Sequence, residues 1–461
     1  MPRWSRRAVA LVVFEGVLLV AAVAIATYLR LGGEGTLYIY LHQSGFWKAA
    51  LIAGVVQTSL YYADLYDLSL VTDRRELFVR LVQALGGASL ALAAVYYWFP
   101  SLVIGRGVFA YSAVFVISLV VGWRLVFEWV SRQVGPRERL LLVGTSPGAI
   151  GLASELFAMR QDLGVEIVGF VDPDPAKVGA PILNPGVIGT IEDIPSIVRA
   201  RNVDRVVVSL ADARGKLPME KLLEMKLEGV TFDHLPSVYE EYTGKIAVEN
   251  LRPSWLIFSE GFRKSRTQLA IKRSLDVLIA AVGLVAGAPV FAATALAVRL
   301  SSPGPVLYHQ RRVGQRGRIF TMHKFRSMRQ DAEAATGPVW ASKDGDPRAT
   351  TVGRIMRKTR LDELPQLWNI LMGDMSFVGP RPERPEFVAD LTKQIPYYGQ
   401  RHVVRPGLTG WAQVRYSYGA SKEDALQKLQ FDLFYIKNFS VSLDAYIIFE
   451  TVKTVILRKG A

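Results

Sequence analysis

Residues 8–29, AVALVVFEGVLLVAAVAIATYL, carry a single charged side chain, that of Glu15. A helix of this length is long enough to cross a hydrocarbon core of about 30 Å. The alternative is a secretory signal peptide, because basic residues precede the segment and Ala-Ile-Ala at 24–26 resembles a cleavage site. The apolar part of a signal peptide is only about 7–15 residues long, and more apolar segments follow. The sequence therefore favours a membrane helix.

The rest of the N-terminal part has further apolar segments, at residues 49–63, 77–99 and 108–123. Lys and Arg precede the first segment, separate the second from the third and follow the fourth, whereas the loop after the first has none. The positive-inside rule then places both ends of this part in the cytoplasm. We predict a four-helix transmembrane bundle over residues 1–132, in which Glu15 is either functional or a satisfied packing contact.

The composition narrows the class of protein without naming a partner. A chain of 461 residues suggests two to four domains. Hydrophobic residues make up 50%, and mean hydropathy is +0.22 with a pI near 9.8. The formal net charge of +14 is compatible with nucleic acid, anionic lipid or phosphate-rich ligands. The absence of cysteine excludes a disulfide framework and thiolate catalysis.

Residues 138–250 alternate short β-rich runs with helical stretches. The run RLLLVG at 139–144 is typical of a buried strand that enters a glycine turn, and a helical stretch follows it. This rhythm predicts an α/β domain of Rossmann type with a parallel sheet. Gly144, Gly148 and Gly151 lie at the turn, where amide groups can hold a phosphate, but their spacing differs from G-x-G-x-x-G. We therefore favour a structural or regulatory domain over one that holds a nucleotide.

The third part, residues 264–461, opens with an apolar stretch at 277–298 that contains Pro289. Basic residues flank the stretch on both sides, so both flanks prefer the same face of a membrane. Proline removes a helix hydrogen bond and kinks the chain. We predict a re-entrant helix over residues 272–299 that enters one leaflet, bends at Pro289 and returns, within a mainly α-helical catalytic domain. A buried core helix of a soluble domain is the alternative.

The stretch that can carry chemistry is GRIMRKTRLDELPQL at residues 353–367. Asp362 and Glu363 are adjacent, and neighbouring side chains on a helix point about 100° apart, so we expect different roles for them. An aspartate can attack phosphorus to form an acyl phosphate. Arg357 can clamp a phosphate, and Mg²⁺ would neutralise the phosphate oxygens. The alternative is a solvated helix start with salt bridges.

Several motifs occur in order around this stretch. They are KR at 272–273 with Asp276, the proline-broken segment, KFRSM at 324–328, LDELPQ at 361–366, GDMSFVGPRP at 373–382 and RPGLTGWAQ at 405–413. Together they make the C-terminal part resemble the bacterial sugar transferases, or monotopic phosphoglycosyl transferases. The predicted bundle and Rossmann-like part resemble those of the family's large members, the polyprenyl glycosylphosphotransferases of exopolysaccharide, capsule and O-antigen assembly.

The resemblance implies a ping-pong reaction. Asp362 would attack the sugar-bearing phosphate of a UDP-sugar, expel UMP and carry the hexose 1-phosphate until polyprenyl (undecaprenyl) phosphate takes it. Glu363 would be the partner of Asp362, and Mg²⁺ would bind at Asp362. The residues expected to bind substrate phosphate are Arg357, Lys324, Arg326, Arg381 and Arg405. The family often has Ser-Pro where this chain has Ala288-Pro289, so the bend must rest on Pro289 and other partners.

These inferences place the protein in the bacterial inner membrane as a multi-pass enzyme with its catalytic domain on the cytoplasmic face. Its expected partners are a UDP-sugar, polyprenyl phosphate and membrane lipid. The sequence leaves open whether the protein forms a homo-oligomer such as a dimer. Nucleic acid is not expected, because that function would call for aromatic stacking platforms in a soluble module, which a membrane-docked segment fits poorly. One alternative is a nucleotide-sugar-binding regulatory or scaffold membrane protein of polysaccharide export. Another, a nucleotide-sugar epimerase or dehydrogenase, is disfavoured because the Rossmann-like part shows no acid–base constellation.

Overall fold

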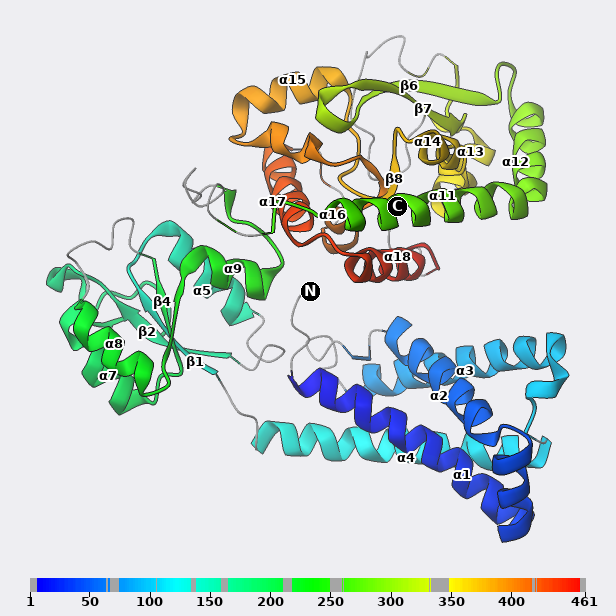
Figure 1. Ribbon diagram of the computed structural model, residues 1–461, viewed down its shortest axis with the longest axis horizontal. Coiled ribbons are helices and arrows are strands. Elements are labelled where there is room, and N and C mark those ends of the chain that lie inside the picture. The colour runs from blue at the N-terminus through cyan, green and yellow to red at the C-terminus, as the bar shows by residue number, and fades with distance from the viewer. Residues whose placement is uncertain are drawn as a thin grey trace. The chain divides into compact units, whose positions relative to one another are not determined.

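The structure is a computed structural model. It describes residues 6–63, 65–66, 74–104, 106–133, 138–158, 165–209, 218–248, 259, 261–330, 332, 348–416, 419 and 421–456. The chain divides into two compact units, residues 2–238 and residues 239–461. Figure 1 shows the elements of each unit in the colour order of the sequence, from blue to red.

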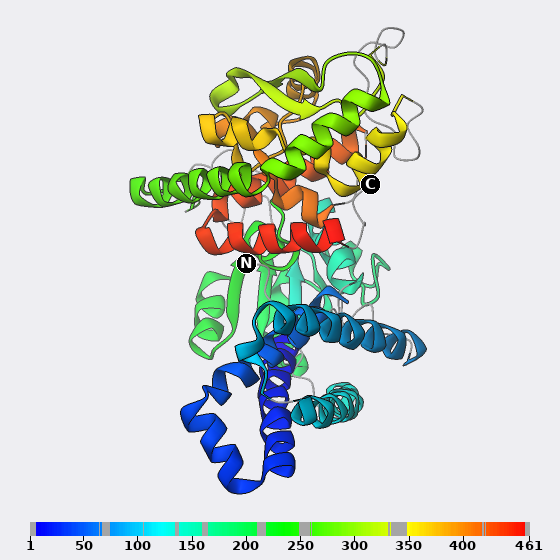
Figure 2. The same ribbon diagram turned by 90° about the vertical axis from the view of Figure 1, so that its right-hand side faces the viewer.

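Long apolar helices form the N-terminal part, as the sequence predicts (Figure 2). They are α1 (Arg6–His42), α2 (Gly45–Tyr62), α3 (Arg74–Trp98) and α4 (Arg106–Gln133), with the 3₁₀ turn η1 (Pro100–Leu102) between the last two. Small and branched side chains such as Ala22 and Val120 fill their common core, which lets the helix backbones approach closely. In the described residues, Leu11–His42 and Arg80–Trp98 are long and apolar enough to cross a membrane, and Tyr111–Arg124 is a shorter apolar helix. A bundle in which all four helices span remains a prediction.

Glu15 has a packing role in this helical part. Its side chain is fully buried and lies 2.7 Å from Nε of Arg124 on α4. Arg124 also donates a 2.6 Å hydrogen bond to the carbonyl of Leu65, and its guanidinium lies 5.2 Å from the ring centroid of Tyr66. A buried charge is tolerated when it is paired in this way. Glu15 is therefore an ion-paired contact between α1 and α4, which fits the packing role, one of the two roles that the sequence left open.

A five-stranded parallel sheet forms the core of the α/β part. Its strands are β1 (Glu138–Val143), β2 (Val165–Val171), β3 (Val187–Gly189), β4 (Arg205–Val208) and β5 (Thr231–His234), in the order β3-β2-β1-β4-β5. The connections contain α5 (Pro147–Ala158), η2 (Pro175–Lys177), η3 (Ile191–Asp193), α7 (Ile194–Arg201) and α8 (Met219–Leu227). Leu141 and Val206 are buried in this core, because a parallel sheet with helical crossovers is covered on its faces. The predicted α/β domain with a parallel sheet is confirmed.

The C-terminal unit begins inside α9 (Leu235–Thr243) and is mainly helical. Its helices are α11 (Arg266–Ala286), α12 (Ala288–Ser301), α13 (Thr351–Thr359), α14 (Gln366–Met372), α15 (Pro385–Gln394), α16 (Trp411–Arg415), α17 (Lys422–Asn438) and α18 (Val441–Ile456). The 3₁₀ turns are η5 (Gln315–Gly317), η6 (Leu361–Glu363) and η7 (Tyr398–Val403). The hairpin β6 (Leu307–Val313) and β7 (Ile319–Phe325) is antiparallel, and β8 (Ser376–Val378) pairs in parallel with β9 (Gly407–Thr409).

The apolar stretch of this unit bends between α11 and α12 by 63°. The bend lies at Gly287, where a Cβ would stand 2.5 Å from the carbonyl oxygen of Gly283. Pro289 follows in the first turn of α12, where proline costs no helix hydrogen bond because that N–H has no intrahelical partner. The bend therefore rests on glycine as well as on Pro289. Its geometry fits a broken span or a re-entrant loop, and the re-entrant helix remains a prediction.

Candidate active site

The adjacent carboxylates lie on a tight turn between two helices. α13 ends at Thr359 because Arg360 adopts a left-handed conformation with φ of 58°. The segment that carries Asp362 and Glu363 is then the 3₁₀ turn η6 instead of a continuing α-helix. In a 3₁₀ turn neighbouring side chains diverge by about 120°, so the two carboxylates still point in different directions. Both side chains are buried, with residue exposures of 7% each.

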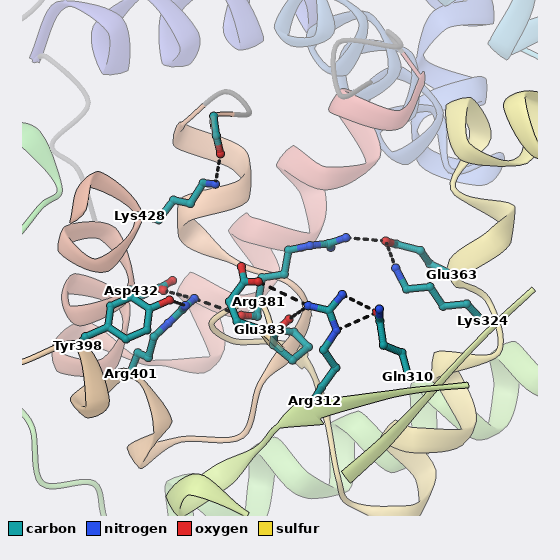
Figure 3. Close-up of polar contacts among 12 residues, drawn as sticks. Gln310, Arg312, Lys324, Glu363, Arg381, Glu383, Tyr398, Arg401, Lys428 and Asp432 are labelled. Carbon is teal, nitrogen blue, oxygen red and sulfur yellow. Dashed lines mark hydrogen bonds and ion pairs between the residues drawn. The ribbon is translucent and has the colours of Figure 1, made fainter. Parts of the chain in front are cut away.

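Glu363 is neutralised by cations from separate elements. Its Oε1 accepts a hydrogen bond of 3.1 Å from Nζ of Lys324 on β7 and one of 2.8 Å from Nη2 of Arg381 (Figure 3). Arg360 lies 3.8 Å from the same oxygen. Burial opposes ionisation, but the charges of Lys324 and Arg381 outweigh it and hold the pKa of Glu363 well below its usual range. Glu363 is therefore a carboxylate at neutral pH.

Asp362 has the opposite environment. Its Oδ1 is buried and has no hydrogen-bond partner in the described part of the chain. Burial and the neighbouring charge of Glu363 raise the pKa of Asp362 to about 6, although Lys324, Arg360 and Arg381 partly oppose this. At neutral pH Asp362 is thus mainly ionised, and its Oδ1 accepts no hydrogen bond from the described residues. A desolvated carboxylate of this kind is suited to attack an electrophile.

Packing of distant elements brings Lys324 to the turn. Asn369 on α14 donates a 2.7 Å hydrogen bond to the carbonyl of Thr321 and accepts one of 3.0 Å from the amide of His323. These bonds fix β7 against α14, and Lys324 follows directly. Asn369 is 1% exposed, so both bonds are shielded from water and correspondingly strong.

The other predicted phosphate ligands lie in several places. Arg326 donates hydrogen bonds of 2.7 and 3.0 Å to the backbone oxygen and Oγ of Ser302, while its Nε and Nη1 have no partner among the described residues. Arg357 is partly buried in the last turn of α13. Arg405 has a pKa lowered by burial and by the charge of Arg273, with Asp276 opposing the shift. The structure therefore brings Lys324 and Arg381 to the carboxylates and places Arg326 and Arg405 in other surroundings.

Sequence reasoning missed Arg360 and Asn369 as parts of this site. Arg360 stands three residues before Glu363, a spacing that signals an ion pair on any helical turn. Asn369 acts through hydrogen bonds to the backbone of β7, which lies far away in the sequence. No local sequence pattern predicts such a contact. Both residues shape the electrostatics or the geometry around the two carboxylates.

The donor set fits the expected Mg²⁺. Among the described residues there is no group of three or more His, Asp or Glu side chains that could hold a metal. Mg²⁺ does not need such a cage, because it is often bound through one or two carboxylates, waters and substrate phosphates. The buried Oδ1 of Asp362, for which the described part of the chain offers no hydrogen-bond partner, is the kind of ligand that such a site uses.

Two family profiles and several known proteins match the sequence of this chain. The sequence profile of the family described as "Bacterial sugar transferase" matches residues 267–458, and that described as "CoA-binding domain" matches residues 62–220. The chain is 41% identical over 259 residues to the UDP-N-acetylgalactosamine-undecaprenyl-phosphate N-acetylgalactosaminephosphotransferase of Aeromonas hydrophila. It is 37% identical over 280 residues to the undecaprenyl-phosphate glucose phosphotransferase of Komagataeibacter xylinus. It is 34% identical over 352 residues to the UDP-glucose:undecaprenyl-phosphate glucose-1-phosphate transferase of Escherichia coli K12.

These similarities extend beyond the catalytic segment. The alignments cover 56%, 59% and 73% of this chain and, in the same order, 60%, 52% and 72% of the relatives. The chain thus spans little more than half of the first two relatives and nearly three quarters of the third. With the profile match over the unit that holds Asp362 and Glu363, the chain belongs to the bacterial sugar transferase family.

Proposed function

We propose that the protein transfers a hexose 1-phosphate from a UDP-sugar to undecaprenyl phosphate, releasing UMP. The observation that carries the proposal is the asymmetry of the buried pair. Glu363 is held ionised by three cations, whereas Asp362 keeps a buried oxygen without a hydrogen-bond partner among the described residues. The names of the relatives, which are undecaprenyl-phosphate sugar phosphotransferases, supply the substrate class.

The reaction proceeds in two displacements. In the first, a carboxylate oxygen of Asp362 attacks the sugar-bearing phosphorus, the bond to the bridging oxygen breaks, and UMP leaves with the electron pair. In the second, a phosphate oxygen of undecaprenyl phosphate attacks the same phosphorus, and the acyl phosphate bond breaks to regenerate the Asp362 carboxylate. Splitting one displacement into two in this way is covalent catalysis. No net proton change is required at Asp362.

The cations around Glu363 serve the entering diphosphate. Lys324 and Arg381 are 17% and 26% exposed at their side chains, so substrate can reach them. A phosphate that approaches Asp362 meets their charge, which offsets the repulsion between two anions. Mg²⁺ bound through Asp362 would add further neutralisation of the phosphate oxygens.

Attachment to the membrane explains how a lipid substrate reaches this site. Leu278, Val282 and Val285 on α11 are 59%, 57% and 77% exposed, which suits contact with lipid better than contact with water. We infer that α11 and α12 form a re-entrant helix in the inner membrane and that the catalytic unit lies on the cytoplasmic face. Undecaprenyl phosphate and a soluble UDP-sugar then meet at the interface, and the product starts exopolysaccharide, capsule or O-antigen assembly.

UMP release tests the proposal. The purified full chain in lipid nanodiscs is supplied with Mg²⁺, undecaprenyl phosphate and, one at a time, UDP-glucose, UDP-galactose, UDP-N-acetylglucosamine and UDP-N-acetylgalactosamine. We expect release with at least one sugar, none with Asp362→Asn, and normal release with the exposed control Asp390→Asn. An inactive wild type, or an Asp362→Asn variant as active as wild type, would exclude the proposal.

A further inference from the structure

Hydrogen bonds to consecutive backbone carbonyls hold the loop that carries Arg381. The consecutive backbone oxygens of residues 380–383 each accept a hydrogen bond from outside the loop. The bonds run from the amide of Gly407 to Pro380 (2.9 Å), from Nη2 of Arg401 to Arg381 (3.1 Å), from Nη1 of Arg312 to Pro382 (2.9 Å) and from the amide of Val313 to Glu383 (2.9 Å). Two prolines in this run fix the φ angles of the backbone as well. The loop is therefore a rigid base for one side chain.

Arg401 is the buried member of this set. It is 5% exposed, and its Nη1 donates a 2.6 Å hydrogen bond to the hydroxyl of Tyr398. Its Nη2 lies 2.7 Å from Oδ2 of Asp432 on α17, whose side chain is 2% exposed (Figure 3). The guanidinium fork thus joins a buried carboxylate to the carbonyl of Arg381, a geometry that lysine cannot reproduce.

Stability alone gives little reason for a buried ion pair at this place. Desolvation of two charges offsets most of their attraction, and well-packed apolar side chains of similar size are often as stable or more so. What the pair does provide is a fixed donor for the Arg381 carbonyl. At the other end of the same residue, the guanidinium of Arg381 donates to Oε1 of Glu363 at 2.8 Å. Arg401 and Glu363 therefore hold the two ends of Arg381.

We propose that Arg401, held by Asp432, is a positioning residue for the phosphoryl transfer: it fixes the backbone of Arg381 and so sets where the Arg381 guanidinium meets Glu363 and the incoming phosphate. The inference rests on the function proposed above. Arg401 contacts neither carboxylate of η6 in the described structure and acts through Arg381. A displacement of about 1 Å at a reacting group is enough to lower a rate by up to about 100-fold.

The test replaces the ion pair as a unit. The double variant Arg401→Met/Asp432→Leu removes both charges, which avoids leaving either one buried and unpaired. Rapid quenching without acceptor measures the rate constant of phosphosugar-enzyme formation, and steady-state assays give the KM for the UDP-sugar. We expect the rate constant to fall about 10- to 100-fold while the KM changes less than about threefold, since the transition state depends on the position of Arg381 more than binding does.

Combination with Arg381→Met separates positioning from general damage. If Arg401 acts through Arg381, the pair replacement has little further effect, less than about twofold, once the Arg381 side chain has been truncated. The matched control Lys437→Met/Glu240→Leu removes another ion pair of α17, whose atoms lie 2.6 Å apart, and should leave the rate constant unchanged. Thermal melting confirms folding of each variant, and Arg401→Lys, which keeps a charge opposite Asp432, replaces the double variant if that one does not fold.

The possible results are distinct. A wild-type rate in the folded pair variant, or the same fold-loss with and without Arg381→Met, overturns the positioning role. A wild-type enzyme that releases no UMP under any condition contradicts the proposed function instead.

Discussion

Asp362 and Glu363 share the same degree of burial, yet their environments drive their pKa values in opposite directions. Burial disfavours the charge of both carboxylates. Among the described contacts, Lys324 and Arg381 donate hydrogen bonds to Glu363 and not to Asp362. The negative charge of Glu363 then adds to the effect of burial and raises the pKa of Asp362 further. In the mechanism proposed above, Asp362, whose Oδ1 has no hydrogen-bond partner among the described residues, is the group that reacts, and Glu363 organises the cations.

Replacing Lys324 tests this division of roles. Lys324→Met removes one of the cations on Glu363 and the positive charge that eases the approach of a diphosphate to Asp362. We expect kcat/KM for the UDP-sugar to fall about 100-fold, the usual scale for loss of one charge-stabilising group. Lys358→Met, which changes an exposed lysine of α13, is the control and should stay within about twofold. Equal activity of the two variants would contradict the role given to Lys324.

The sequence predicted that Asp362 and Glu363 form the reactive pair, but it did not predict that their environments differ. Asp362 and Glu363 stand out because their motif is local and resembles that of a known family. The contact of Lys324 with Glu363 joins residues 39 positions apart, and it depends on how β7 packs on α14. The ion pair of Arg401 with Asp432 depends likewise on tertiary packing, so its members look like ordinary surface charges in the sequence.

Among the elements, the pairing of β8 with β9 sets the position of the Arg381 loop. The amide of Gly379 donates to the carbonyl of Thr409, and the amide of Gly407 donates to that of Pro380, each at 2.9 Å. The backbones meet so closely that a Cβ on Gly379 would lie 2.4 Å from the carbonyl oxygen of Arg405. Glycine is required here because two backbone segments of the chain approach each other closely, not because of a turn.

The variant Gly379→Ala measures how strictly this approach is needed. We expect the free energy of unfolding to fall by about 1–3 kcal/mol, the common cost of overpacking, and UMP release to fall with it because the Arg381 loop must shift. Gly399→Ala is the matched control, since a Cβ there meets no atom of the described residues within 4 Å, and it should change stability by less than about 0.5 kcal/mol. Denaturation followed by circular dichroism compares them, and indistinguishable curves would refute the prediction.

His402 on η7 makes the stability of this region depend on pH. Burial and the charge of Arg401 lower the pKa of His402 to about 4, against about 6.5 in an unfolded chain. Between these values the unfolded chain binds the proton and the folded chain does not, so stability is lost as pH falls from about 6.5 towards 4. From pH 7 to pH 5 the loss is about 1–2 kcal/mol.

The variant His402→Gln isolates this contribution. Its stability should decline less than that of the wild type over the same pH range, by the same 1–2 kcal/mol. Chemical denaturation at pH 5 and pH 7 gives the difference. Parallel pH profiles for the two proteins would show that His402 does not titrate in this way.

The elements themselves were largely predictable, for different reasons. Short runs of branched apolar residues, separated by glycine turns, predicted the parallel sheet. Long apolar runs predicted α1, α3 and α4. The change from helix to η6 was not predictable from periodicity, because Arg360 is a residue that seldom adopts φ of 58°. At the bend, Gly287 lies so close to the carbonyl of Gly283 that a side chain would not fit. The sequence drew attention to Pro289 instead, because a proline is the usual sign of a bend in a helix.

For the whole molecule, the central issue is how the catalytic unit is attached to the membrane. The helices α11 and α12 meet the length and composition of a span only as a pair bent by 63°. Basic residues on both flanks, including Arg273 and Arg299, favour a common side. The proposed re-entrant helix would place both flanks on the same side and would keep the basic remainder of the unit on the cytoplasmic face.

Single cysteines decide between entering and crossing, because the chain has no cysteine of its own. Thr267→Cys and Ser301→Cys lie at exposed positions near the two ends of the bent pair. With a membrane-impermeant maleimide added to intact cells, we expect neither to be labelled, and with inverted vesicles we expect both. Labelling of one position alone from either side would show that the segment spans.

The proposed mechanism depends on a covalent bond to Asp362, and trapping that bond tests it most directly. The full chain is mixed with a UDP-sugar that it accepts, without undecaprenyl phosphate, quenched in acid and digested for mass spectrometry. We predict a hexose-phosphate adduct on the peptide that contains Asp362, discharged when acceptor is added before the quench. An adduct on another residue, or UMP release at full rate without any adduct, would contradict this mechanism.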